Sequence, residues 1–138
     1  MRFSTRSRYG TRLMIELAKK YENGPVELRK IAEIQGISEK YLGQIIIKLK
    51  AKKLVSSYRG AHGGYYLLKP PKDITLLEIV ECLEAHDLIS DCIKNMNSCK
   101  RSEDCFARDV WKGLNFKIEE YLENVTLQDL LEKNIDIL

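Results

Sequence analysis

Histidine is scarce in this chain of 138 residues, which contains only two. A histidine-based metalloenzyme motif is absent, and so are a glycine-rich phosphate-binding loop and a nucleophile–base signature. No apolar run reaches the roughly 18 residues that a membrane span requires. These absences give little support to an enzyme or a membrane protein.

Two further absences concern location and order. The first ten residues, MRFSTRSRYG, lack the apolar core of a signal peptide, so we expect a cytoplasmic protein. Apolar residues make up 44% of the chain and charged residues 31%, which is not the composition of a disordered protein. The length fits one ordinary domain, or a small domain with an appended arm.

Positive charge is concentrated in the first half of the chain. Residues 1–72 contain 16 Lys and Arg against 5 Asp and Glu, a net charge of +11. The remaining residues have a net charge of −8, which leaves +3 overall. A basic half joined to an acidic half indicates that the first half contacts a polyanion.

The basic half contains three helical patterns. Apolar spacing predicts a first helix over about residues 7–23, which the Asn-Gly-Pro turn at 23–25 would end. A short second helix follows in VELRKIAEIQ, with Ile34 among its candidate packed residues. Gly36 provides a tight turn, and Ser38 caps a third helix over about 38–52 whose buried stripe is Leu42, Ile45, Ile46 and Leu49. This arrangement is typical of a helix-turn-helix.

The segment LVSSYRGAHGGYYLLKPP predicts a β-hairpin with Arg59 and His62 at its tip. A hairpin directly after a helix-turn-helix is typical of a winged helix. The predicted fold class is therefore mainly α: a winged helix-turn-helix with a two-stranded wing, followed by a long C-terminal helix.

Double-stranded DNA is the polyanion that this arrangement fits. On the third helix, Gln44 has the donor and acceptor pair that adenine presents, and Lys48 can neutralise a phosphate. Arg59 suits the negative potential of a narrow minor groove, and Arg6 and Arg12 could add backbone contacts. The candidate DNA-binding residues are Arg2, Ser4, Arg8, Ser38, Tyr41, Gln44, Lys48, Arg59, His62, Gly63 and Gly64. The alternative is that these side chains form an ordinary solvated face.

The acidic half is predicted to hold three more helices. Thr75 and Glu78 form a capping box for a helix to about residue 84, and a cysteine-containing loop follows. A long helix over about 104–124 has a broad apolar side, and Thr126 caps a final short helix. We divide the chain into a DNA-binding domain (1–72), a short helix with a cysteine sensor loop (73–103), and a dimerisation helix with a C-terminal helix (104–138).

The segments MRFSTRSRYGTRLMIELA and SEKYLGQIIIKLKAKKLVSSYRGAHGGYYLLKPPKDITLLEIVECLE, with the three clustered cysteines, resemble one bacterial family of winged-helix regulators. The family includes the iron–sulfur regulator IscR, the nitric-oxide sensor NsrR and the cysteine-metabolism repressor CymR. The resemblance implies a homodimer that binds pseudo-palindromic DNA and dimerises through the long helix. It also implies DNA contacts from Ser38, Tyr41, Gln44, Arg59 and the turn at 62–64.

Cys92, Cys99 and Cys105 lie together in DCIKNMNSCKRSEDC, whereas Cys82 fits the apolar pattern of the helix before it. Their spacing is too wide for a typical structural zinc site, so an iron–sulfur cluster is the favoured cofactor, which the resemblance also implies. A thiol redox switch without a cluster is the alternative.

The fourth ligand of such a cluster is left open by the sequence. IscR-like members have a histidine three residues after the last cysteine, where this chain has Arg108, and NsrR-like members use an N-terminal aspartate, where this chain has Arg8. The first two cysteines also lie one residue further apart than in IscR-like members. The candidates are His86, Asp87, Asp91, Asp104 and Asp109.

Together, these features predict a dimeric DNA-binding transcriptional regulator that senses iron–sulfur, redox or nitric-oxide status through its three cysteines. The alternatives are a thiol-switch or cysteine-metabolism repressor without a cluster, and a winged-helix module that binds a protein partner.

Overall fold

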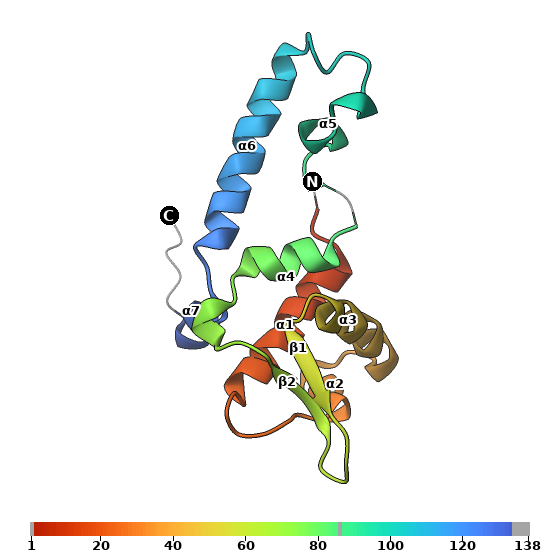
Figure 1. Ribbon diagram of the computed structural model, residues 1–138, viewed down its shortest axis with the longest axis vertical. Helices are drawn as coiled ribbons and strands as arrows, with labels where there is room; N and C mark the ends of the chain where they lie inside the picture. The colour runs from red at the N-terminus through yellow and green to blue at the C-terminus, as the bar shows by residue number, and fades with distance from the viewer. Residues whose placement is uncertain (1, 86, 134–138) are drawn as a thin grey trace.

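The computed structural model describes residues 2–85 and 87–133, and it is elongated, with a winged helix at one end and a helical arm at the other (Figure 1). In chain order the elements are α1 (Thr5–Lys19), α2 (Leu28–Gln35), α3 (Glu39–Ala51), β1 (Val55–Tyr58), β2 (Gly64–Leu67), the 3₁₀ turn η1 (Pro71–Asp73), α4 (Leu76–Leu83), α5 (Asp91–Lys94), the 3₁₀ turn η2 (Met96–Ser98), α6 (Phe106–Glu123) and α7 (Leu127–Glu132).

Helix α1 is shorter at its end than the sequence pattern predicts. Ser4 caps its start by accepting a hydrogen bond from the Ser7 amide. The predicted continuation to residue 23 is wrong, because Glu22 and Gly24 adopt left-handed backbone conformations with φ of 69° and 92°. A continued right-handed helix is incompatible with those angles.

The predicted helix-turn-helix is confirmed in α2 and α3. Gly36 ends α2 in the left-handed conformation with φ 63°, and the Ser38 hydroxyl accepts from the Tyr41 amide to cap α3. The four predicted apolar residues of α3 are all buried. Packing of Ile34 is not observed, since its side chain is 66% exposed.

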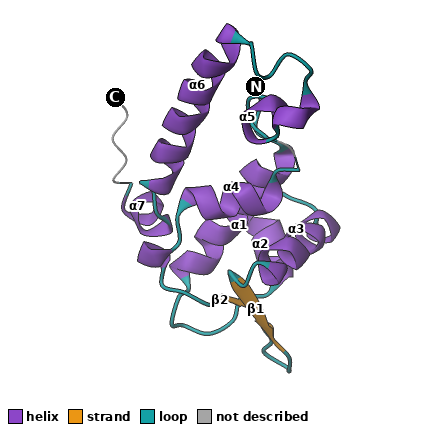
Figure 2. Ribbon diagram, turned by 45° about the horizontal axis from the view of Figure 1, so that its top comes forward, coloured by secondary structure: helices purple, strands orange, loops and turns teal. Residues whose placement is uncertain are grey.

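The wing is an antiparallel hairpin in which Val55 pairs with Leu67 and Tyr58 with Gly64. It is held against the chain before α2 by two backbone hydrogen bonds of 2.8 Å between Val26 and Tyr65. A Cβ atom on Gly64 would collide with the Val26 carbonyl, so this attachment needs glycine there. The orange strands therefore form a unit with the helices beside them (Figure 2).

The hydrophobic core lies under α1 and extends from the helix-turn-helix to α4 and α7. Its fully buried members include Leu13, Leu17, Ile45, Leu83 and Leu127. Gly10 lies where α1, α3 and α4 meet, because a Cβ atom there would collide with Leu83 of α4 and lie 3.3 Å from Ile45 of α3. Helices α4 and α7 are thus packed directly on the winged helix.

Helices α4 and α7 begin side by side. Both predicted caps are confirmed: Thr75 with Glu78, and Thr126 with Asp129, each form a reciprocal capping box. The two caps are joined by backbone hydrogen bonds, from the Leu76 amide to the Val125 carbonyl and from the Leu127 amide to the Ile74 carbonyl. The chain after the arm therefore returns to the winged helix.

The arm consists of α5, η2 and the long α6. The prediction of an unstructured cysteine loop is wrong in part, because α5 and η2 form two short turns within it. No helix in residues 2–85 and 87–133 is long and apolar enough to cross a membrane.

Candidate DNA-binding surface and cysteine loop

Helix α3 presents a polar face away from the core. Gln44 and Lys48 are exposed, and neither side chain hydrogen-bonds to any other residue in the described part of the chain. Ser38 is exposed at the start of the same helix, with its hydroxyl committed as the cap. Ser38, Gln44 and Lys48 are therefore all accessible on this helix.

Tyr41 differs from its predicted place on the open face because its ring is half buried. It packs edge-on against Tyr9 of α1, with ring centroids 5.9 Å apart. This aromatic pair fixes α3 against α1.

The wing places Arg59 and His62 on an exposed tip. Gly63 and Gly64 are partly covered, and their lack of side chains allows close approach of the Tyr58 and Val26 carbonyls. The structure thus gives both glycines a packing role, and their contact with DNA stays a prediction.

At the N-terminus, Arg2 and Arg8 are exposed, whereas Ser4 is engaged. The Ser4 amide donates to the Glu84 carboxylate at 2.8 Å, which ties the start of α1 to the end of α4. Burial alone would raise the pKa of Glu84, but hydrogen bonds from Ser7 and Ser4 and the nearby Arg6 lower it overall.

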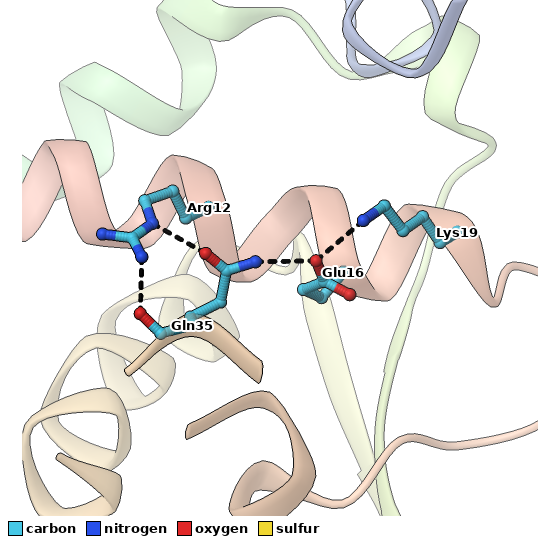
Figure 3. Close-up of polar contacts among 4 residues, drawn as sticks. All are labelled: Arg12, Glu16, Lys19 and Gln35. Carbon is cyan, nitrogen blue, oxygen red and sulfur yellow. Dashed lines mark hydrogen bonds and ion pairs between the residues drawn. The ribbon is translucent and has the colours of Figure 1, made fainter. Parts of the chain in front are cut away.

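A chain of polar side chains joins α1 to α2 (Figure 3). Gln35 is the last residue of α2. The Arg12 guanidinium donates to the Gln35 side-chain oxygen at 2.7 Å and to the Gln35 backbone carbonyl. The Gln35 amide donates to Glu16 at 2.7 Å, and Glu16 is also paired with Lys19 at 2.9 Å. Arg12 therefore positions α2, and its guanidinium is already occupied by these contacts.

Cys82 connects α4 to α3. Its thiol donates to the Lys48 carbonyl at 3.3 Å, and burial raises the pKa of the thiol although Lys52 and Lys48 oppose this. The half-buried position agrees with the apolar interpretation of this cysteine.

The other three cysteines lie along the arm. Cys92 is on α5 with its sulfur 3.1 Å from the Ser90 hydroxyl, Cys99 is exposed after η2, and Cys105 immediately precedes α6. Three thiols suit an iron–sulfur cluster in kind and would supply three of its usual four ligands. As placed, however, they do not form its site, since no three His, Cys, Asp or Glu among the described residues are arranged to hold a metal ion.

Among the proposed fourth ligands, Asp87 is paired with Lys94 at 3.3 Å, while Asp91, Asp104 and Asp109 are exposed. His86 lies outside the described residues.

Arg108, at the position where the resemblance to IscR-like members implies a histidine, is buried at 8% exposure. Its guanidinium donates to the Cys92 carbonyl at 2.8 Å and to the Ile93 carbonyl at 3.4 Å. The side chain thus attaches α5 to α6. The sequence pattern does not reveal this role, because a lone arginine in a charged segment is usually solvated.

Helix α6 has its faces reversed relative to an ordinary surface helix. The stripe that faces its own chain contains two polar residues, Arg108 and Asn115, before it reaches Leu122. The outward stripe is apolar and exposed; it comprises Phe106, Val110, Trp111, Leu114 and Tyr121. The predicted apolar side is therefore directed outward, away from its own fold.

Comparison with known proteins identifies this architecture. The profile of the Rrf2 family, described as iron-dependent transcriptional regulators, matches residues 3–133. The transcriptional regulator CymR of Bacillus subtilis is 38% identical over 130 residues, which covers 94% of this chain and 89% of CymR.

Two solved structures agree. IscR of T. potens superimposes with a TM-score of 0.81 at 38% identity, covering 97% of this chain and 88% of IscR. CymR of B. subtilis, described as the global cysteine regulator, gives a TM-score of 0.79 at 35% identity over 96% and 98% of the two chains. These relatives are winged-helix transcriptional regulators rather than enzymes. The chain belongs to the Rrf2 family of transcriptional regulators.

Proposed function

We propose that this regulator acts as a homodimer that binds a pseudo-palindromic DNA operator and senses cellular state through Cys92, Cys99 and Cys105. The observation that carries the proposal is the reversed face of α6. A helix that turns Trp111 and Leu114 to the outside, with exposures of 45% and 41%, leaves apolar area that a second copy would bury. A two-fold dimer presents two recognition helices to one duplex.

DNA contact is supported by the surface of the winged helix. Gln44 and Lys48 on α3 and Arg59 on the wing are exposed and lie in the half of the chain with net charge +11. We assign base reading to Gln44 and phosphate contact to Lys48, Arg2 and Arg8. Arg59 and His62 at the wing tip are assigned to the minor groove.

The cysteine loop is the proposed sensor, with an iron–sulfur cluster as the group that it would hold. The donor atoms support this assignment, and IscR relatives support it by similarity. Because the three thiols are not grouped in the arrangement described, binding a cluster requires the segment between α5 and α6 to close. A thiol switch without a cluster does not require the three thiols to come together.

The first experiment measures binding to DNA by fluorescence anisotropy, using an operator selected from a random library and scrambled DNA as control. We expect the selected operator to bind at least about a thousandfold more tightly than scrambled DNA. Gln44→Ala should weaken operator binding by about 1–3 kcal/mol and leave binding to scrambled DNA unchanged. Equal affinity for both DNAs would contradict the proposal.

The cofactor is tested by anaerobic purification. A visible absorption band with matching iron and sulfide content, lost in each of Cys92→Ala, Cys99→Ala and Cys105→Ala, supports a cluster. Cys82→Ala is the matched control and should keep the band. A colourless protein that stays free of iron after reconstitution contradicts the cluster and leaves the thiol switch.

A further inference from the structure

A cavity of about 450 Å³ lies between α4, α5 and α6. Asn95 and Ser98 of the cysteine segment line it, but none of the cysteines does. Part of its wall is apolar, from Leu77, Val80 and Leu88. The rest is mainly polar, and it includes carboxylates from several segments: Glu81, Glu84, Asp87, Asp91 and Glu119. Within the described lining, Lys94 is the one basic side chain.

Asn115 of α6 lines this cavity and is only 6% exposed. Its side-chain amide makes no hydrogen bond with any residue among 2–85 and 87–133. Among the side-chain polar atoms of the described residues, only the Ser102 hydroxyl is both fully buried and without a partner, so the Asn115 amide is not sealed off and its polar atoms open into the cavity. An amide facing an acidic cavity from a buried position points to a bound polar ligand.

The chain's own Lys94 shows which chemistry the cavity accommodates. Its ammonium lies 3.3 Å from Asp87 and 3.4 Å from Glu119, between the segment after α4 and helix α6. Burial alone would lower the pKa of Lys94, but these two carboxylates raise it. The side chains of Glu81 and Asp91 form no ion pair within the described residues, so acidic groups in the lining are left without a counterion.

A metal ion does not match this arrangement. Divalent cations need several oxygen ligands at one point, and no such group of three exists among the described residues. The carboxylates are instead distributed around a wall that also has apolar sections. A ligand with separated positive charges joined by methylene groups is complementary to that pattern.

We propose that this cavity binds a linear aliphatic diamine or polyamine, with its ammonium groups on the carboxylates and one of them donating to the Asn115 side-chain oxygen. Its methylene groups contact Leu77, Val80 and Leu88. The cavity volume lies within the usual range for small-molecule sites, about 300–1,000 Å³. The proposal does not depend on DNA binding or on a cluster.

Isothermal titration of the full-length protein with spermidine, without DNA, tests it. We expect saturable binding that Asn115→Leu and Glu81→Gln each weaken by about tenfold, because each removes one ligand contact. Glu123→Gln removes an equal charge from an exposed position on α6 outside the cavity and should change the affinity by less than about twofold.

The proposal is overturned if spermidine gives no saturable heat, if both cavity variants bind as the parent protein does, or if Mg²⁺ at the same concentration displaces spermidine. If Asn115→Leu does not fold, as judged by circular dichroism, Glu81→Gln decides the result, since Glu81 is exposed at the cavity rim.

Discussion

Arg8 and Arg12 lie one turn apart on α1 and have the same charge, yet their surroundings differ. Arg8 is exposed, with one 3.4 Å contact to the Thr5 hydroxyl, whereas Arg12 is held by Gln35 through two hydrogen bonds. We expect Arg8→Gln to reduce the salt dependence of DNA binding by about one phosphate contact for each protomer, with no change in stability.

Arg12→Gln should have the opposite profile. Losing the contacts at the end of α2 should lower the free energy of unfolding by about 1 kcal/mol and leave the salt slope unchanged. Urea unfolding at equal protein concentration and anisotropy titrations at several salt concentrations measure both quantities. Identical profiles for the two variants would show that the Gln35 contacts do not determine the role of Arg12.

Substitutions at Ser38 and Gln44 should likewise distinguish a residue that caps α3 from one that reads a base. Ser38→Ala removes the cap of α3 and should lower the free energy of unfolding by about 1 kcal/mol. Gln44→Ala should change it by less than about 0.5 kcal/mol while weakening operator binding by about 1–3 kcal/mol. A stability loss in Gln44→Ala would mean that its side chain supports the fold.

Residues whose roles depend on near neighbours were predictable from the sequence. The sequence predicts Ser38, Thr75 and Thr126 as caps because a cap needs only an amide three residues away, and the structure has all three of these hydrogen bonds. Arg12 and Gln35 are 23 residues apart in the sequence, and a local sequence pattern cannot predict a contact between residues so far apart. Asn115 was missed for a related reason, since a single amide between apolar residues has no periodic signal.

At the scale of elements, the start of α4 should make stability depend on pH. Burial alone would raise the pKa of Glu78, but the hydrogen bond from Lys69, at 2.7 Å, and the one from the Thr75 amide lower it. A lowered folded pKa means that the carboxylate stabilises the fold above its unfolded pKa, and that this contribution is lost as pH falls through the folded value.

The free energy of unfolding of Glu78→Gln should therefore fall below that of the parent protein at about pH 6, by less than about 1 kcal/mol because the group is partly exposed. The difference should shrink as the pH falls below about 4. When Lys69→Met is also present, the pH-dependent part of the stability difference caused by Glu78→Gln should be smaller. A difference that stays constant with pH would contradict the assignment of Glu78.

Helix α6 should control assembly. Leu114→Glu places a carboxylate on the exposed apolar stripe, and burying it in a dimer would be unfavourable, so we expect the dimer dissociation constant to rise about a hundredfold. Sedimentation velocity measures this. As a control, Lys112→Glu places a carboxylate on another exposed position of α6 and should preserve the dimer. If both Leu114→Glu and Lys112→Glu are monomeric, the added charge and not the apolar stripe is responsible.

The apolar breadth of α6 was predictable from the sequence, but its direction was not. Periodicity identifies the stripe containing Trp111 and Leu114 and is equally consistent with a core. The structure resolves this because Arg108 and Asn115 occupy the inward side. The two turns α5 and η2 were missed because they are short and weakly patterned.

At the scale of the whole molecule, a dimer fixes the distance between its two recognition helices. We expect the selected operator to contain inverted half-sites whose centres are separated by about one helical turn, or a multiple of it. Five base pairs inserted between them place the half-sites on opposite sides of the duplex and should reduce the affinity to that of scrambled DNA. Unchanged affinity would indicate that the protomers bind independently.

Gly10 determines how a signal could pass through this molecule. At this residue the side chains of Leu83 on α4 and Ile45 on α3 approach the backbone of α1 directly, because a Cβ atom on Gly10 would collide with Leu83 and lie 3.3 Å from Ile45. The three helices are therefore closely packed here. Because the packing around Gly10 leaves no free space, a shift of α4 must also move the helices that it contacts. We therefore expect that a displacement of α4 would be transmitted through α1 and would reorient α3.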